Sequence, residues 1–131
     1  MPNRRAAQFF AAAFALLSGA TILALSLVPE VGLASGALAA PSTNWAHLPA
    51  YLLLSVLATM YAAPRTAVSA MSLGLVLVAF SGAIELIQPL VGRSLSLKDF
   101  IFNVLGVAGG IALGTLALRL SANATVYARS R

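Results

Sequence analysis

The stretch SGAIELIQPLVGRSLSLKDFIFNVLG, from Ser81 to Gly106, places Glu, Gln, Arg, Lys, Asp and Asn between two long apolar runs. Charge is scarce in the chain, because only 8% of its 131 residues are charged and 60% are hydrophobic. A soluble domain carries about 25% charged residues, and the mean hydropathy here is +0.95. We therefore expect a single domain over residues 1–131 that lies mostly in a lipid bilayer.

Four apolar segments are long enough to span that bilayer as helices, since about 30 Å of hydrocarbon takes about 20 helical residues. Pro29, Pro64 and Pro89 fall at or near segment ends, where a helix is expected to stop. The sequence therefore predicts an all-α polytopic membrane protein with four transmembrane helices in an antiparallel bundle. The helices are expected over residues 6–28, 45–63, 66–91 and 97–120, with a loop of small residues over 29–44.

Other classes of protein fit the sequence less well. Arg4 and Arg5 precede the first run, and Ala37-Leu38-Ala39 resembles a signal-peptidase site, but the run is longer than a usual signal peptide and ends well before that site. The absence of cysteine excludes disulfides and thiolate metal sites. Eight scattered basic residues form no extended stripe, so we expect no nucleic-acid partner.

The basic residues instead predict the orientation of the helices. If four helices alternate in direction, two basic residues, Arg93 and Lys98, lie on one side of the membrane and the other six lie on the opposite side. Cytoplasmic loops carry the excess of Lys and Arg. We therefore expect a bacterial plasma (inner) membrane protein with both termini in the cytoplasm, and with the loop between the third and fourth helices facing outward. The cytoplasmic basic residues are Arg4, Arg5, Arg65, Arg119, Arg129 and Arg131.

Two stripes of small and polar residues are expected on the last two helices, at 100° per residue. The stripe on the third helix contains Ala67, Ala70, Gly74, Ser81, Glu85 and Gln88. The stripe on the fourth contains Asp99, Asn103, Gly106, Gly110, Gly114 and Ala117. Gly106, Gly110 and Gly114 form two overlapping GxxxG units, which allow helix backbones to approach closely in lipid. We expect the two stripes to face each other or a shared interior, with the glycines serving helix packing.

Polar residues from three segments also converge on the outward side. His47 and Tyr51 lie one turn apart at the start of the second helix, near the expected positions of Glu85, Gln88, Arg93, Asp99 and Asn103. Purely structural roles are the alternative for residues of this region. Glu85 would then pair with Arg93 or with the fourth helix, Ser96 and Asp99 would cap that helix, and Lys98 would anchor lipid headgroups. No spacing demands a metal or another cofactor, so none is expected.

These residues resemble the signature of the VanZ-like family of small bacterial membrane proteins. Glu85-x-x-Gln88 followed by Arg93, Asp99, Asn103 and Gly106 is similar to its central motif, and His47-Leu48-Pro49-Ala50-Tyr51 to its H-x-x-x-Y segment. The likeness covers residues 25–114, although Asn44-Trp45 stands where the family often has Asp-Lys. The resemblance implies a cell-envelope protein, linked to glycopeptide (teicoplanin) resistance or to envelope polymer biogenesis.

The sequence leaves several functions open. The first hypothesis is recognition of the anionic head of an envelope lipid or lipid-linked precursor, with Tyr51, Gln88, Arg93 and Asn103 as ligand-binding residues. The second is an enzyme, a hydrolase or transferase, acting on such a lipid, with His47, Glu85 and Asp99 as catalytic residues. The third is a proton-linked transporter that uses Glu85, and the fourth is a packing subunit of an envelope complex, or a homo-oligomer.

Overall fold

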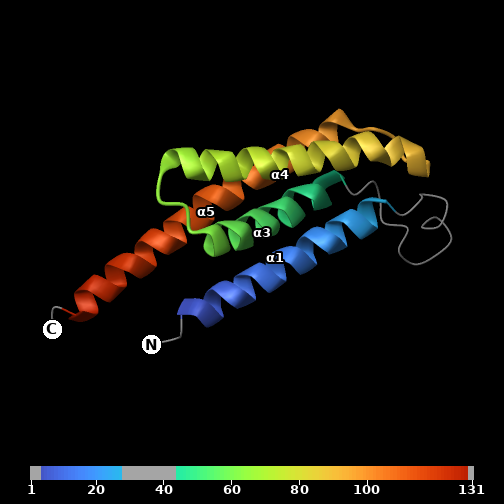
Figure 1. Ribbon diagram of the computed structural model, residues 1–131. Coiled ribbons are helices and arrows are strands. Elements are labelled where there is room, and N and C mark those ends of the chain that lie inside the picture. Colours follow the sequence, from blue (N-terminus) through green and yellow to red (C-terminus); the bar gives the residue numbers. More distant parts are fainter. Residues whose placement is uncertain (1–3, 28–43, 130–131) are drawn as a thin grey trace.

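The computed structural model describes residues 4–27 and 44–129, and these residues form helices and no strand (Figure 1). The predicted all-α class is confirmed. The expected loop over 29–44 and the signal-peptidase-like site lie outside the described residues, apart from Asn44. The elements are α1 (Arg4–Ser26), α3 (Asn44–Ala62), α4 (Ala67–Ile87), the 3₁₀-helix η1 (Gln88–Val91) and α5 (Leu97–Arg129).

Three segments are long and apolar enough to cross a membrane, namely residues 5–26, 67–91 and 97–124. The apolar part of α3, Ala46–Ala62, is shorter. Large apolar side chains cover the outside of the bundle, among them Leu16 at 75% exposure and Val68 at 71%. Soluble proteins of this size rarely expose so large an apolar surface to water. The chain is therefore a membrane protein with a helical bundle.

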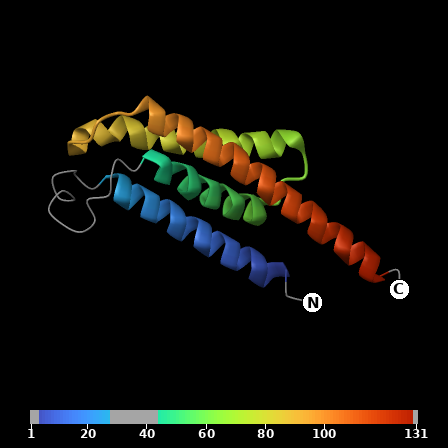
Figure 2. The same ribbon diagram turned by 180° about the vertical axis from the view of Figure 1, so that it is seen from behind.

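The helices are arranged around α3, which contacts α1, α4 and α5. α5 packs along α3 over much of its length, while α1 lies against the other side of α3 (Figures 1 and 2). α4 touches α5 more than it touches α3. α1 begins and α5 ends on the same side of the bundle (Figure 1). The polar residues of interest lie at the opposite side, which we call the α4–α5 end and which contains residues 84–103.

The glycine stripe of α5 packs against α3. A Cβ atom built on Gly106 would lie 2.6 Å from the Leu48 carbonyl oxygen, and one on Gly110 would lie 2.5 Å from that of Leu52. One on Gly114 would lie 2.8 Å from the Thr59 Cβ atom. These distances are shorter than any side chain allows, so only glycine permits this approach. The glycines therefore share an interior with α3, and they do not face the stripe of α4.

The ends of α4 explain where the helical spans differ from those expected. Thr66 caps α4 through a reciprocal capping box with Ser69. The expected helix over 66–91 is α-helical only to Ile87, after which η1 contains Pro89, whose ring removes a backbone donor. Gly92 ends η1 with φ 79° in the left-handed region. α5 continues to Arg129, nine residues beyond the expected end at Leu120, because no proline or glycine interrupts it there.

Candidate functional site

A polar cluster joins three helices at the α4–α5 end. His47 comes from the first turn of α3 and Glu85 from the last turn of α4. Asp99 and Asn103 come from the first two turns of α5, and Ser96 directly precedes that helix. The sequence separates these residues by up to 56 positions, yet the bundle brings their side chains into contact. We call His47, Glu85, Ser96, Asp99 and Asn103 the polar cluster.

Asn103 lies at the centre of the polar cluster and is only 1% exposed. Its Oδ1 atom lies 3.0 Å from Nδ1 of His47, and its Nδ2 atom donates to Oε1 of Glu85 at 3.5 Å. Because an amide oxygen can only accept, Nδ1 of His47 carries a hydrogen in this arrangement. Asn103 thus bridges α3 and α4 through both ends of its amide, and α5 holds the bridge in place.

Glu85 is a buried carboxyl inside an apolar span, with 4% of its surface exposed. Besides Asn103, the backbone N–H of Ser96 donates to its Oε2 atom at 3.4 Å. Each carboxyl oxygen therefore receives one donor from a neutral group. An ionisable side chain at this depth is costly and usually marks a functional position, and here the cost is offset by hydrogen bonds from α5 and from the turn before it.

His47 also faces Asp99, with 3.9 Å between Nε2 and Oδ2. Both side chains are partly exposed, at 17% and 15%, so this pair lies nearer the surface than Glu85 does. Asp99 donates its backbone N–H to Oγ of Ser96 at 3.2 Å, which is the N-cap that the spacing of Ser96 and Asp99 suggested. Asn103 thus orients the imidazole through Nδ1, while Oδ2 of Asp99 lies near Nε2 but beyond hydrogen-bond distance.

Tyr51 and Gln88 are both almost completely buried. Tyr51 is 1% exposed and lies beside Ser81 and near Glu85, so it is close to the polar cluster. Gln88 is 2% exposed, and its backbone carbonyl accepts from the N–H of Arg93 at 3.0 Å. Burial leaves little of either side chain accessible.

Arg93 is positioned differently from the other predicted residues. Its Nη1 atom donates to the carbonyl oxygen of Leu25 at 3.4 Å, in the last turn of α1. The structure therefore directs this guanidinium toward α1, whereas the polar cluster is formed by α3, α4 and α5. Arg93 and the polar cluster share the α4–α5 end, and Arg93 also contacts α1.

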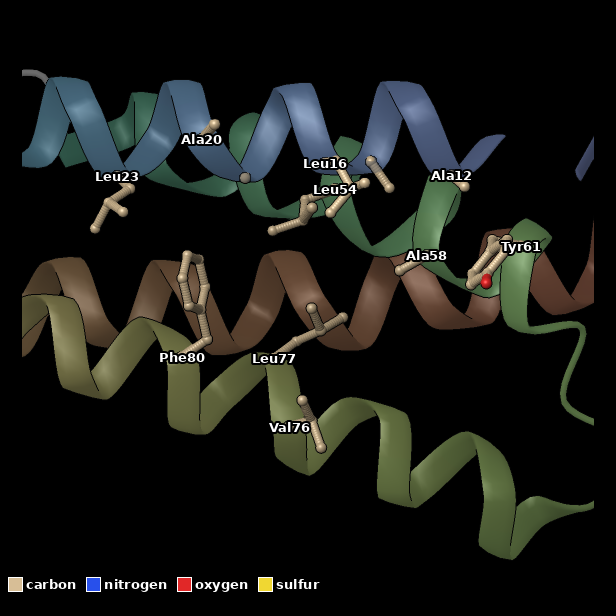
Figure 3. Close-up of a pocket in the computed structure, with 12 residues that line it drawn as sticks. Ala12, Leu16, Ala20, Leu23, Leu54, Ala58, Tyr61, Val76, Leu77 and Phe80 are labelled. Atoms are coloured by element: carbon tan, nitrogen blue, oxygen red, sulfur yellow. The ribbon is translucent and has the colours of Figure 1, made fainter. Parts of the chain in front are cut away.

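An apolar groove, which sequence reasoning missed, runs between α1 and α4 with α3 as its floor. Its volume is about 630 Å³. Figure 3 shows Leu23 of α1 and Phe80 of α4 pointing toward each other across it. Small residues spaced three or four apart on α1 were the available signal, because they leave space beside a neighbouring helix. The lining residues are Ala12, Ala15, Leu16, Gly19, Ala20, Leu23, Leu54, Ala58, Tyr61, Val76, Leu77 and Phe80.

Arg93 and the last lining residue of the groove lie at the same end of α1. Leu23 lines the groove, and the Leu25 carbonyl that Arg93 contacts lies about 3 Å further along the helix axis and about 200° around it. The end of α1 thus carries an apolar groove on one face and a cationic side chain on another. This arrangement is suited to an amphiphile with an anionic head and a hydrocarbon chain.

Metal binding finds no support in the residues that the structure describes, which contain no group of three or more His, Cys, Asp or Glu side chains able to hold an ion. Comparisons of the chain with family models, with curated proteins and with solved structures give no match. Membership of the VanZ-like family therefore stays a prediction from the residues quoted above.

Proposed function

We propose that this protein binds the anionic head of a cell-envelope lipid, or of a lipid-linked envelope precursor, in the bacterial plasma membrane. The observation that carries this proposal is an apolar groove between α1 and α4 on a helix whose last turn also contacts the guanidinium of Arg93. A hydrocarbon chain fits the groove, and a phosphate, pyrophosphate or carboxylate suits a guanidinium, whose planar fork of N–H donors matches two oxygen atoms.

The proposal includes an orientation. Four membrane-spanning helices with both termini in the cytoplasm direct the α4–α5 end outward, so that Arg93 meets the head of a lipid in the outer leaflet. The charge pattern supports this orientation, since Arg5, Arg65 and Arg119 belong to the other side. A role in teicoplanin resistance or envelope polymer biogenesis follows only if the family resemblance holds.

Native mass spectrometry of the protein released from detergent tests the proposal. We expect the wild type to retain a lipid adduct that Arg93→Ala loses, because the variant removes the cation at the α4–α5 end. Arg65→Ala is the matched control, since it removes an exposed arginine from the turn at the opposite end of α4. Equal retention by wild type and Arg93→Ala would contradict a role of Arg93 in binding the head.

A second candidate function, hydrolysis or group transfer on such a lipid, is favoured by the 3.9 Å contact of His47 with Asp99. An imidazole that Asn103 orients through Nδ1 can act as a general base through Nε2, and the nearby carboxylate of Asp99 can stabilise the charge that forms on it. We expect His47→Gln and Asp99→Asn to abolish turnover of a bound lipid while retaining its adduct. Unchanged turnover in both variants would eliminate this candidate.

A further inference from the structure

The partly exposed edge of the polar cluster presents two hydrogen-bond acceptors that do not bond to each other. Nδ1 of His47 carries the ring hydrogen, because it faces the amide oxygen of Asn103. In the neutral imidazole Nε2 is then an acceptor, and it lies 3.9 Å from Oδ2 of Asp99, which is also an acceptor. This separation is too long for a direct hydrogen bond, and one donor group between the two atoms can bond to both.

The polar cluster also brings together two carboxyl groups without a basic side chain to pair with them. Asn103 and the backbone of Ser96 are neutral donors to Glu85. Within the part of the chain that the structure describes, no Lys or Arg side chain forms a salt bridge with Glu85 or Asp99. Lys98 is exposed and lies about 100° around α5 from Asp99. A cation bound at this edge would therefore compensate charge that the bundle itself leaves unpaired.

The carboxyl group of Asp99 has unused bonding capacity. Its Oδ1 atom is buried and has no hydrogen-bond partner among the described residues. The cap of α5 uses the backbone N–H of Asp99, which donates to Ser96, and does not use the carboxyl group. Because nearly all buried polar atoms in proteins have a partner, this carboxyl group points to a ligand that donates hydrogen bonds.

These acceptors determine the chemistry of the ligand. A primary ammonium group carries a positive charge and three N–H donors on one compact atom, so it can bond to both side chains. A guanidinium fork instead matches the two oxygen atoms of a single carboxylate, whereas the acceptors here come from two residues. A quaternary ammonium group has no N–H donor, and its recognition depends on aromatic rings.

We infer that the edge of the polar cluster between Nε2 of His47 and Oδ2 of Asp99 binds a primary ammonium group. Both residues lie in the first turn of their helices, α3 and α5, so the site is at the level of lipid headgroups. Phosphatidylethanolamine and soluble amines both carry this group. The inference goes beyond the proposed function, because it assigns a cation to residues other than Arg93.

Two lipids with identical acyl chains test the inference by native mass spectrometry. Phosphatidylethanolamine and phosphatidylcholine share a phosphate and a positive charge, but only the first has N–H donors. We expect the wild type to retain phosphatidylethanolamine about tenfold more, a difference of about 1.4 kcal/mol. Asp99→Asn keeps the shape of the side chain and the backbone cap, and it should remove this preference without changing retention of phosphatidylcholine. Ser94→Lys, the control, changes the net charge equally at an exposed position and should keep the preference.

Nuclear magnetic resonance covers soluble amines. His47 is the only histidine, so the nitrogen signal of Nε2 is assigned without ambiguity in histidine-labelled protein. If the site takes a soluble amine, ethanolamine at constant pH will shift this signal in the wild type and not in Asp99→Asn. Choline, which has no N–H donor, should shift it in neither.

The outcomes separate the two sources and the two proposals. A preference for phosphatidylethanolamine assigns the ammonium group to a lipid head, and a shift by ethanolamine without that preference assigns it to a soluble amine. If neither is observed, or if Asp99→Asn leaves both unchanged, the inference fails. Equal retention of the two lipids, lost in Arg93→Ala, would support the proposed function alone. A preference that persists in Arg93→Ala would support the inference alone.

Discussion

Ala63 and Gly92 adopt the same left-handed backbone conformation, with φ 44° and 79°. The left-handed conformation costs a residue with a Cβ atom about 1–2 kcal/mol of conformational free energy, a cost that glycine does not have. We predict that Ala63→Gly stabilises the protein and that Gly92→Ala destabilises it, each by about 1 kcal/mol. No atom lies within 4 Å of a Cβ built on Gly92, so its effect is purely conformational. Thermal unfolding in detergent measures both, and shifts of the same sign would refute this explanation.

Asn103 links three helices with one amide, so its loss should be costly. Asn103→Leu leaves Oε1 of Glu85 and Nδ1 of His47 without their present partner. We expect destabilisation of about 1–3 kcal/mol, the usual cost of leaving buried polar groups unpaired. Asn123→Leu is the control, because that asparagine is exposed on the same helix. Similar unfolding temperatures for both variants would show that the bridge contributes nothing to stability.

The sequence predicts much of the polar cluster, because the residues themselves encode it. Helical periodicity and alternating topology suffice to bring His47, Glu85, Asp99 and Asn103 to one end of the bundle. The direction of Arg93 was not predictable in the same way. It depends on where α1 packs beside α3, and no residue of the turn over 92–96 specifies that. The groove escaped prediction for the same reason, since it exists only between helices that are distant in sequence.

At the scale of elements, the contact of α3 with α5 depends on glycines that leave no room for a side chain. A Cβ atom on Gly110 would lie 2.5 Å from the Leu52 carbonyl oxygen, whereas one on Gly109 would lie 3.7 Å from Leu52 Cδ1, an ordinary contact. We predict that Gly110→Ala lowers stability by about 1–3 kcal/mol, as overpacking does. Gly109→Ala should be nearly neutral or slightly stabilising. Equal unfolding temperatures for the two variants would contradict the tight packing of these helices.

The glycine stripe also shows what periodicity predicts for a helix. The spacing of Gly106, Gly110 and Gly114 identifies the packed face of α5, because those residues recur once per turn. It does not identify the partner, which is α3. Helix lengths were more predictable, since the hydrocarbon thickness sets a minimum. It sets no maximum, and α5 runs on to Arg129.

For the whole molecule, the orientation in the membrane is open to direct measurement, because the chain has no cysteine. We predict that a membrane-impermeant maleimide labels Ser94→Cys from outside intact cells and labels Ala122→Cys only after the membrane is opened. The physical reason is the excess of arginine on the side of Arg65 and Arg119. A permeant maleimide, which should label both variants, controls for reactivity. The reverse labelling pattern would place Arg93 in the cytoplasm.

The most direct measurement of lipid binding in the groove is photocrosslinking with a phosphatidic acid that carries a diazirine on one acyl chain, followed by mapping of the labelled residues. We predict label on groove residues such as Leu54, Leu77 and Phe80, removed by excess unmodified phosphatidic acid and much reduced in Arg93→Ala. Label spread evenly over all lipid-facing positions, including the exposed Leu105 and Leu113 of α5, would show that the lipid merely surrounds the protein, and it would contradict the account.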